Sequence, residues 1–270
     1  MRLLRNFWSA FKQFFTSFPF IFQNQLGHFF LIALFSAAAL WISWYFVNTS
    51  VNDWINQIVS DGLSSLSVWE WTPSWLQSTM LWIVDWSVFG TLIWIQIKLF
   101  KFVVLFALSP LMSVVASKTY GKLNPSHESG HHSLMNQILR GMGAAVLFTS
   151  IEWFLVAMLF LLSFLISSFI PILSPLLVLV PIISGVISTW FYGAVLTDYS
   201  CELKGLSPTR SLLLSWKNFG KVLGLGFPFY FLMFVPILSW FLGPVIGLVT
   251  CVVASMKLWH AEPSKLHRQE

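Results

Sequence analysis

Long apolar runs alternate with short polar segments along this chain, and the lengths of these runs predict helices that cross a membrane. Residues 26–47 are mostly apolar, and about 22 residues suffice to cross a hydrocarbon core of roughly 30 Å. A second run, residues 75–117, would be about 60 Å long as a helix, so one end should project into water. The alternation of about ten residues that is typical of membrane β-barrels does not recur. The expected fold class is an all-α integral membrane protein.

The first twenty residues have the spacing of an amphipathic helix. Arg2, Arg5 and Lys12 share one face with other polar residues. The opposite face is apolar and consists of Leu3, Leu4, Phe7, Trp8, Phe11, Phe14, Phe15 and Phe18. We expect this helix, residues 1–20, to lie in the membrane interface. Because cationic and apolar residues alternate, we do not expect it to be cleaved as a signal peptide.

Two further apolar segments, each interrupted by proline, predict helical hairpins. The first, residues 144–197, is flanked by basic residues on both sides, which indicates an even number of crossings. The second, residues 222–258, is shorter than the roughly 40 residues that two full crossings need. We therefore expect the second hairpin to penetrate the membrane only partly, with its arms separated at Gly243-Pro244.

Together these elements predict a single membrane domain over residues 1–270, and the charges between them predict its orientation. Residues 48–74 contain Asp53, Asp61 and Glu70 but neither lysine nor arginine. By the positive-inside rule this segment should be external, and both termini should be cytoplasmic. The expected location is the cell membrane.

Composition excludes a soluble globular protein and provides little for catalysis. The chain is 57% hydrophobic and 9% charged, against roughly 25% charged residues in soluble domains. Its two cysteines, Cys201 and Cys251, are too few for a disulfide framework and are expected to be free thiols. Neither a nucleophile elbow nor a glycine loop for phosphate occurs. We expect no enzyme activity, no catalytic residue, no cofactor and no nucleic-acid partner.

Two acidic residues fall within apolar runs and leave two interpretations open. An acid at the centre of a membrane helix costs about 2.5 to 3.5 kcal/mol, so a buried Asp85 or Glu152 would need a role such as proton or cation coupling. The alternative, which we favour, places both near the interface beside tryptophan residues.

A small group of polar residues between the apolar runs has the spacing of metal ligands. His127, Glu128, His131 and His132 include a histidine pair four residues apart, which could bind a divalent metal on a helix. Pro125 and Gly130 argue against a regular helix there. We therefore favour a solvated loop and expect no metal site.

The start of the first span is a candidate anion site. Gln25, Leu26, Gly27 and His28 precede or open the helix, where unpaired N–H groups and the positive helix end can hold an anion. Every membrane helix has such a start, so a plain helix start is the alternative.

Several short motifs resemble those of the CysZ-type sulfate permease family, which also contains the eukaryotic etoposide-induced membrane proteins. The motifs are Asp198-Tyr199, Ser207-Pro208, the stretch from Val235-Pro236 to Gly243-Pro244-Val245, Lys257-Leu258-Trp259 and, earlier, Ser109-Pro110-Leu111. The resemblance implies two long transmembrane helices, two hemi-penetrating hairpins, a homo-oligomer and passage of sulfate into the cytoplasm for cysteine synthesis.

The sequence departs from that family's pattern where the family carries charge. The family has a pair of arginines at the start of the first span, where this chain has Gly27 and His28, so a guanidinium pair for a divalent oxyanion is missing. The acid that follows the family's Ala-Pro-Phe segment is also absent.

Two hypotheses for the function remain. One is an anion permease using His28 and nearby Lys118 or Lys122, with weak sulfate binding that strengthens below about pH 6.5. The other is a non-transporting membrane scaffold or biogenesis protein. The lipid bilayer is a partner in either case.

Overall fold

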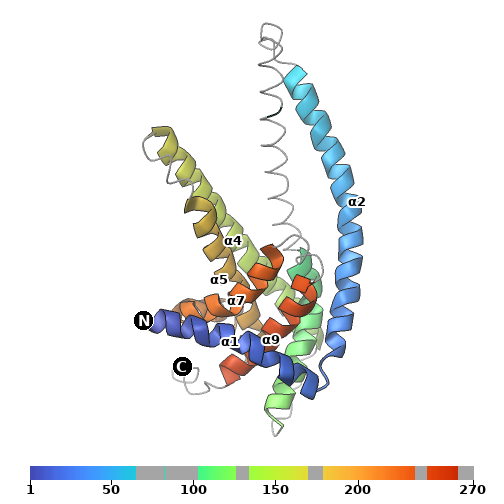
Figure 1. The fold of residues 1–270 in the computed structure, drawn as a ribbon, viewed down its shortest axis with the longest axis vertical. Coiled ribbons are helices and arrows are strands. Elements are labelled where there is room, and N and C mark those ends of the chain that lie inside the picture. Colours follow the sequence, from blue (N-terminus) through green and yellow to red (C-terminus); the bar gives the residue numbers. More distant parts are fainter. Residues whose placement is uncertain (65–81, 83–102, 126–133, 170–178, 235–241, 261–270) are drawn as a thin grey trace. The chain divides into compact units, whose positions relative to one another are not determined.

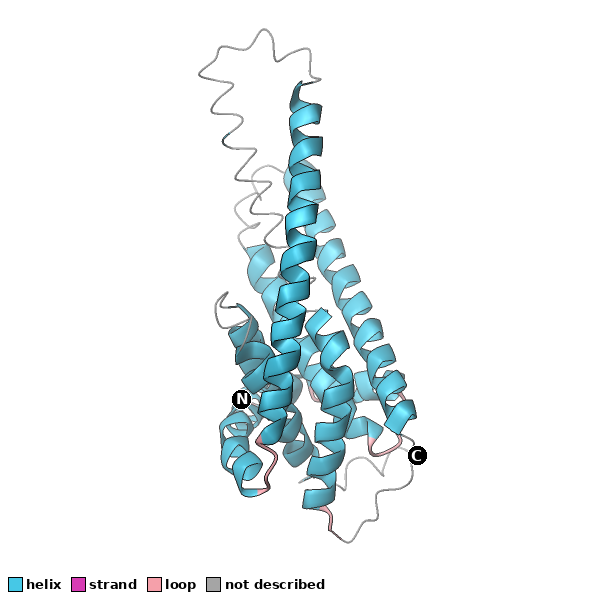
Figure 2. Cartoon of the chain, turned by 90° about the vertical axis from the view of Figure 1, so that its right-hand side faces the viewer, coloured by secondary structure: helices cyan, strands magenta, loops and turns pink. Residues whose placement is uncertain are grey.

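The computed structural model of this chain describes residues 1–64, 82, 103–125, 134–169, 179–234 and 242–260 (Figure 1). Within these ranges all regular structure is helical, and no strand occurs (Figure 2). The all-α fold class predicted from the sequence is therefore confirmed. The helices are α1 (Arg2–Gln23), α2 (His28–Ser64), the helix Val103–Leu123, α4 (Leu134–Phe169), α5 (Leu179–Glu202), α6 (Pro208–Lys217), α7 (Phe219–Phe234), the π-helix η3 (Gly243–Leu248) and α9 (Val249–His260).

Four described stretches are long and apolar enough to cross a membrane. They are Val103–Leu123, Met135–Ile166 within α4, Leu179–Glu202 and Gly243–His260. α1 and the start of α2 form a further pair, bent by 110° at the turn between them. The chain is thus a multi-pass membrane protein by length and composition.

The chain divides into two compact units, residues 38–104 and residues 1–37 with 105–270. Most of α2 belongs to the smaller unit. α2 continues to Ser64, well beyond the predicted end of the first span at Val47. Residues 48–61 contain neither proline nor glycine, so nothing interrupts the hydrogen-bond ladder when the apolar run ends. Of the predicted span 75–117, only Trp82 and the part from Val103 lie within the described residues.

The larger unit contains the helices of both segments that were predicted to form hairpins. α4 and α5 pack against each other, and together they extend beyond the predicted boundaries 144–197 at both ends. α7 packs on η3 and α9, and the joining residues 235–241 lie outside the described residues. Between the hairpins lies α6, which the sequence analysis did not predict. Ser207 caps α6 by accepting a hydrogen bond from the Arg210 N–H at 3.4 Å, and Pro208 occupies its first position.

α1 has three faces rather than the two that its sequence predicts. One face is buried against α7 and α9 and contains Ala10, Phe14, Ser17 and Ile21. Phe7 and Phe11 also contact protein, since their rings lie 5.8 and 5.9 Å from that of Phe227. The exposed apolar face is therefore narrower than predicted and consists of Leu4, Trp8, Phe15 and Phe22. A third face carries Arg2, Arg5 and Lys12.

Glycine residues let α7 approach α5 and α1 backbone to backbone. A Cβ atom on Gly193 of α5 would overlap the Val222 carbonyl oxygen of α7. On the side of α7 that faces α1, a Cβ on Gly220 would lie 2.8 Å from the Leu3 carbonyl oxygen, and one on Gly224 would overlap that of Phe7. Small residues at such crossings are typical of helices that associate within a membrane.

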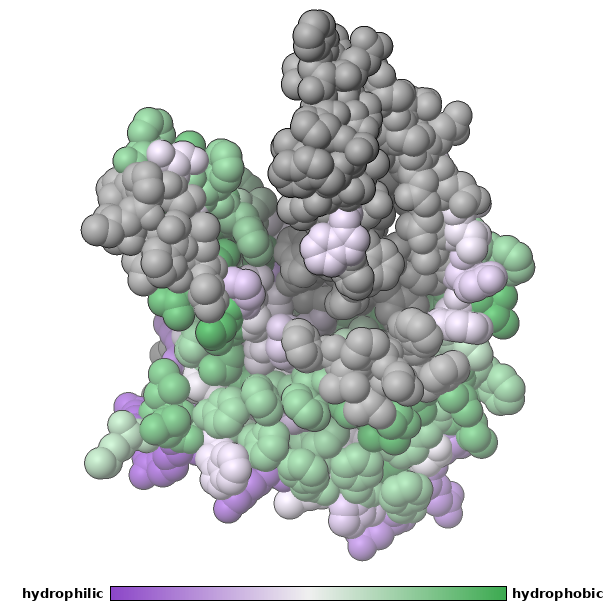
Figure 3. Space-filling view, turned by 45° about the horizontal axis from the view of Figure 1, so that its top comes forward, coloured by the Kyte–Doolittle hydropathy of each residue, from purple (hydrophilic) through white to green (hydrophobic). Residues whose placement is uncertain are grey.

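Hydrophobic side chains cover much of the described surface. In Figure 3 they spread over the visible face, and hydrophilic residues gather along its lower edge. This distribution is expected of a protein whose surface lies mostly against lipid.

Candidate functional site

The predicted anion site forms the turn between α1 and α2. Gln25 adopts a left-handed backbone conformation, with φ of 59°. The Leu26 N–H donates to the Ile21 carbonyl at 2.9 Å, and the Gln25 N–H donates to that of Phe22 at 3.2 Å. This pair of bonds is a Schellman motif, and Leu26 and Ile21, at the two positions whose apolar side chains often pack together in this motif, are both buried. The turn is thus a fixed structure that determines where α2 begins.

His28 is the first residue of α2, and its imidazole is anchored at one nitrogen. Nδ1 lies 2.8 Å from the Gln25 carbonyl oxygen. A carbonyl can only accept, so Nδ1 carries the proton and a neutral ring presents a lone pair at Nε2. Nε2 becomes a donor only when the ring is protonated. The exposed imidazole can therefore bind an anion in its charged form and not in its neutral form.

The same turn leaves two backbone amides for a ligand. The Phe29 and Phe30 N–H groups donate to the carbonyls of Leu26 and Gly27 at 3.1 Å each. Within the described part of the chain, the amides of Gly27 and His28 have no backbone acceptor. Gly27 is half-buried, whereas Gln25 is exposed. The geometry thus offers two N–H groups beside the His28 ring, at the positive end of α2.

A second polar site joins α4 to α5, and it centres on Arg140. Nη2 of Arg140 lies 3.3 Å from Oδ1 of Asp198 and also donates to the Leu206 carbonyl. Nη1 lies 3.5 Å from Oε1 of Glu202. Asp198 and Glu202 are one helical turn apart on α5, so both face the same guanidinium. Both acids are buried, with exposed fractions of 2% and 8%.

A pocket of about 400 Å³ opens beside this cluster. Its lining consists of Asn136, Gln137, Arg140, Glu202, Gly205, Leu206, Ser207 and Pro208. Two buried carboxylates face one guanidinium, so the positive charge of Arg140 is already paired within the protein and is not available to a bound anion. We therefore assign the cluster a structural role, which is to hold α4, α5 and the loop before α6 together.

The loop that follows α5 is also tied to α9. Nζ of Lys204 donates to the Trp259 carbonyl at 2.9 Å. Burial lowers the pKa of the Lys204 amine from its ordinary value. The bond therefore holds a partly desolvated cation at the carbonyl-rich end of α9.

Two of the motifs that carried the family resemblance meet in space. The Tyr199 hydroxyl, on α5, donates to Oγ of Ser109 on the helix Val103–Leu123 at 3.2 Å. Gly141 of α4 lies against the same serine, since a Cβ there would be 2.8 Å from Ser109 Oγ. Asp198, the neighbour of Tyr199, binds Arg140. Residues that are far apart in sequence thus form one buried seam between three helices.

The sequence matches a known family over most of its length. The family model described as sulfate transporter CysZ/etoposide-induced protein 2.4 matches residues 7–244. The chain belongs to this family. No curated protein and no solved structure matches it. The resemblance found in the short motifs is therefore confirmed over most of the chain, whereas the ligand of this CysZ/etoposide-induced family member has to be argued from its own residues.

The sequence analysis did not single out the Arg140 cluster as a site, although a signal for it was present. Asp198 and Glu202 lie four residues apart at the end of an apolar helix, and Arg140 lies near the beginning of another. Ionisable residues in membrane helices almost always face the protein interior and pair with one another. An explicit search for opposite charges at matching depths would have paired them.

The remaining predicted residues are placed as follows. Glu152 lies near the middle of α4 and is buried, with 2% of its surface exposed, near Tyr230 of α7. Asp85 lies outside the described residues, as do the metal-ligand candidates His127, Glu128, His131 and His132. Both interpretations of the two acids stay predictions. Lys118 and Lys122 are exposed on the helix Val103–Leu123.

Proposed function

We propose that this protein carries a small anion of the sulfate class across the membrane into the cytoplasm. The observation that carries the proposal is the match of residues 7–244 to a family whose description names a sulfate transporter. Helices of membrane-spanning length and an anchored helix start agree with this function. The family's description names a transporter, which favours transport over an enzymatic function.

The anion-binding element in this proposal is the turn between α1 and α2. The amides of Gly27 and His28 and the imidazolium of His28 would donate to the anion's oxygens. In other members, by resemblance, a pair of arginines begins the same span, and each lost charge-assisted hydrogen bond is worth roughly 1.5 to 3 kcal/mol. Sulfate binding should therefore be at least tenfold weaker than with the arginine pair.

The proposal includes an orientation in the membrane. Both termini and α6 would be cytoplasmic, and residues 53–70 would be external, because that segment carries three acids and no base. Labelling of single cysteines from each side tests this orientation. Asp61→Cys should react with an impermeant reagent added outside, and reaction only from the cytoplasmic side would reverse the scheme.

Uptake of radiolabelled sulfate into proteoliposomes is the direct test of transport. We expect uptake by the wild type to be greater at acidic than at alkaline pH, because only a charged imidazole donates from Nε2. His28→Ala should abolish this increase. His28→Arg should give uptake that no longer depends on pH, because a guanidinium stays charged. His260→Ala is the matched control, since His260 is also exposed but lies at the end of α9.

Two results would contradict the proposal in different ways. Uptake that is retained and still dependent on pH in His28→Ala would place the anion site elsewhere in the protein. If folded protein shows no uptake and no displacement by competing anions at either pH, the non-transporting scaffold is the better explanation.

A further inference from the structure

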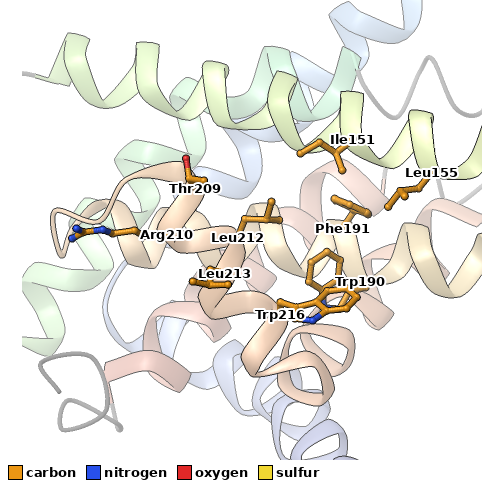
Figure 4. Close-up of a pocket in the computed structure, with 9 residues that line it drawn as sticks. All are labelled: Ile151, Leu155, Trp190, Phe191, Thr209, Arg210, Leu212, Leu213 and Trp216. Carbon is orange, nitrogen blue, oxygen red and sulfur yellow. The ribbon is translucent and has the colours of Figure 1, made fainter. Parts of the chain in front are cut away.

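An apolar groove runs along α4 and α5 and ends at α6. One part, a pocket of about 460 Å³, is lined by residues of all three helices (Figure 4). A second pocket of about 410 Å³ continues from it, because the two share Leu155, Trp190, Phe191 and Trp216. From Ile151 to Leu162 the groove follows α4 for about 16 Å, at 1.5 Å per residue. Its lining is almost entirely hydrocarbon and aromatic rings.

The floor of the groove contains a buried polar group without a partner. Trp190 is 4% exposed, and among the described residues no acceptor lies within hydrogen-bond distance of its indole Nε1. A buried donor left unpaired costs about 1 to 3 kcal/mol. The indole ring lines the groove, but Nε1 itself has almost no accessible surface, so a ligand that brings an acceptor reaches this donor only when the ring shifts. The ester carbonyl of a lipid lies between headgroup and acyl chain and is an acceptor of this kind.

The end of the groove at α6 carries a positive charge. Thr209 and Arg210, in the first turn of α6, line this end. In Figure 4 the Arg210 side chain lies at the edge of the group of labelled lining residues and extends away from Trp190 and Trp216. Both residues are exposed. A guanidinium and a hydroxyl at one rim suit a phosphate group.

We propose that this groove binds one anionic phospholipid. Its phosphate lies at Arg210 and Thr209, an ester carbonyl accepts the hydrogen bond of Trp190 Nε1, and an acyl chain follows Leu155 toward Leu162. The order of these groups along the groove matches their order along a phospholipid molecule. Basic pockets between membrane helices on the cytoplasmic side are suited to anionic headgroups. The site is separate from the α1–α2 turn and does not depend on the proposed transport.

Native mass spectrometry of delipidated protein in detergent, titrated with phosphatidylglycerol or phosphatidylcholine, measures this binding. The wild type should retain one phosphatidylglycerol at least tenfold more tightly than phosphatidylcholine. Trp190→Phe keeps an aromatic side chain but removes the donor, and it should weaken binding of both lipids about fivefold. Arg210→Glu should remove the preference for phosphatidylglycerol, whereas Lys217→Glu reverses a charge on the same helix outside the groove and should preserve it.

Filling the groove is an independent test. Leu155→Trp places bulk where the two pockets join and should reduce the occupancy of phosphatidylglycerol at least tenfold. Phe154→Trp, at the neighbouring position with 64% exposure and outside the groove, should leave occupancy unchanged. Size-exclusion profiles identify any variant that has not folded, and the exposed Arg210 gives a variant that should fold normally. If both lipids bind equally to the wild type and folded variants change neither, the groove holds only ordinary bilayer lipid and the proposal is wrong.

Discussion

α4 and the η3–α9 segment are both long and apolar enough to cross a membrane, but they have opposite surroundings. In the most apolar stretch of α4 28% of the residues are buried, whereas 83% are buried in that of η3–α9. All eight residues from Val249 to Met256 are buried. In α4, by contrast, large side chains such as Phe154, Leu161 and Phe164 are exposed. One segment is a surface of the larger unit and the other is part of its interior.

The more apolar helix is the less buried one, and this reverses the rule for soluble proteins. α4 has the higher hydropathy of the two, because its outer face must dissolve in lipid. The buried α9 contains Thr250 and Ser255, and the preceding η3 contains Gly243 and Gly247. Lipid tails are as apolar as leucine, so helices in a membrane associate through close packing and polar contacts instead. Hydropathy here reports exposure to lipid, and small or polar residues report burial.

The largest predicted effect concerns the polar contacts that join α4 to α5. Arg140→Met would leave Asp198 and Glu202 buried without their cation, which should lower the free energy of unfolding by about 3 to 5 kcal/mol. Unfolding by SDS titration in mixed micelles measures this loss. Arg210→Met removes an exposed arginine and is the control, with an expected change below about 0.5 kcal/mol. A small effect of Arg140→Met would mean that α4 is held by its apolar contacts.

Two neighbouring phenylalanines of α1 show the same contrast between a buried and an exposed apolar surface within a single helix. Phe14 is buried with 6% exposure, and Phe15 is 56% exposed. Phe14→Ala should cost about 3 kcal/mol of stability in detergent through the cavity that it leaves. Phe15→Ala should hardly change stability in detergent but should weaken the protection of α1 from hydrogen exchange in liposomes. The opposite pattern would show that α1 presents a different face to the protein.

These contrasts explain which parts of the fold could be predicted from sequence. Apolar runs gave the helices that became α4, α5, α7 and α9, because the need to satisfy the backbone in lipid leaves few alternatives. α6 was missed because it is a short helix without an apolar run, although its Ser207-Pro208 start is a recognisable cap. The burial of Phe14 could not be predicted, because an amphipathic pattern does not say whether lipid or protein covers the apolar face.

The two candidate sites differ in how far they could be predicted from the sequence. The α1–α2 turn was located from local residues, and its Schellman bonds are local. The left-handed conformation of Gln25 carries no signature, since glycine is the usual residue there. The Arg140 cluster depends on residues 58 positions apart, Arg140 and Asp198, and on a loop carbonyl. Long-range pairings of this kind require the packing of α4 on α5 to be known.

Close packing predicts the next effect. Gly193→Ala would place a Cβ against the Val222 carbonyl of α7, so the helices must separate, at a cost of about 1 to 3 kcal/mol. Gly143→Ala is the matched control on the lipid-exposed helix α4, because no atom lies within 4 Å of the added Cβ. Its higher helix propensity should stabilise the protein by up to about 1 kcal/mol. Thermal unfolding followed by size-exclusion chromatography shows whether Gly193→Ala lowers the stability and Gly143→Ala raises it. Two changes of the same sign would contradict the glycine-mediated contact.

The smallest predicted effect tests whether polar side chains hold the buried segment. Oγ of Ser255 on α9 lies 2.8 Å from that of Ser200 on α5, and both residues are buried. Ser255→Ala should cost about 0.6 kcal/mol, the average for hydrogen bonds between membrane helices. On α4, Ser163 donates to the Leu159 carbonyl of its own helix at 2.7 Å, so Ser163→Ala removes no contact between helices and should cost nothing measurable. SDS unfolding of both variants and of the Ser200→Ala/Ser255→Ala double variant separates the pair energy from the single losses. Additive losses at positions 200 and 255 would mean that the two hydroxyls do not interact, and close packing alone would then hold α9 in the interior.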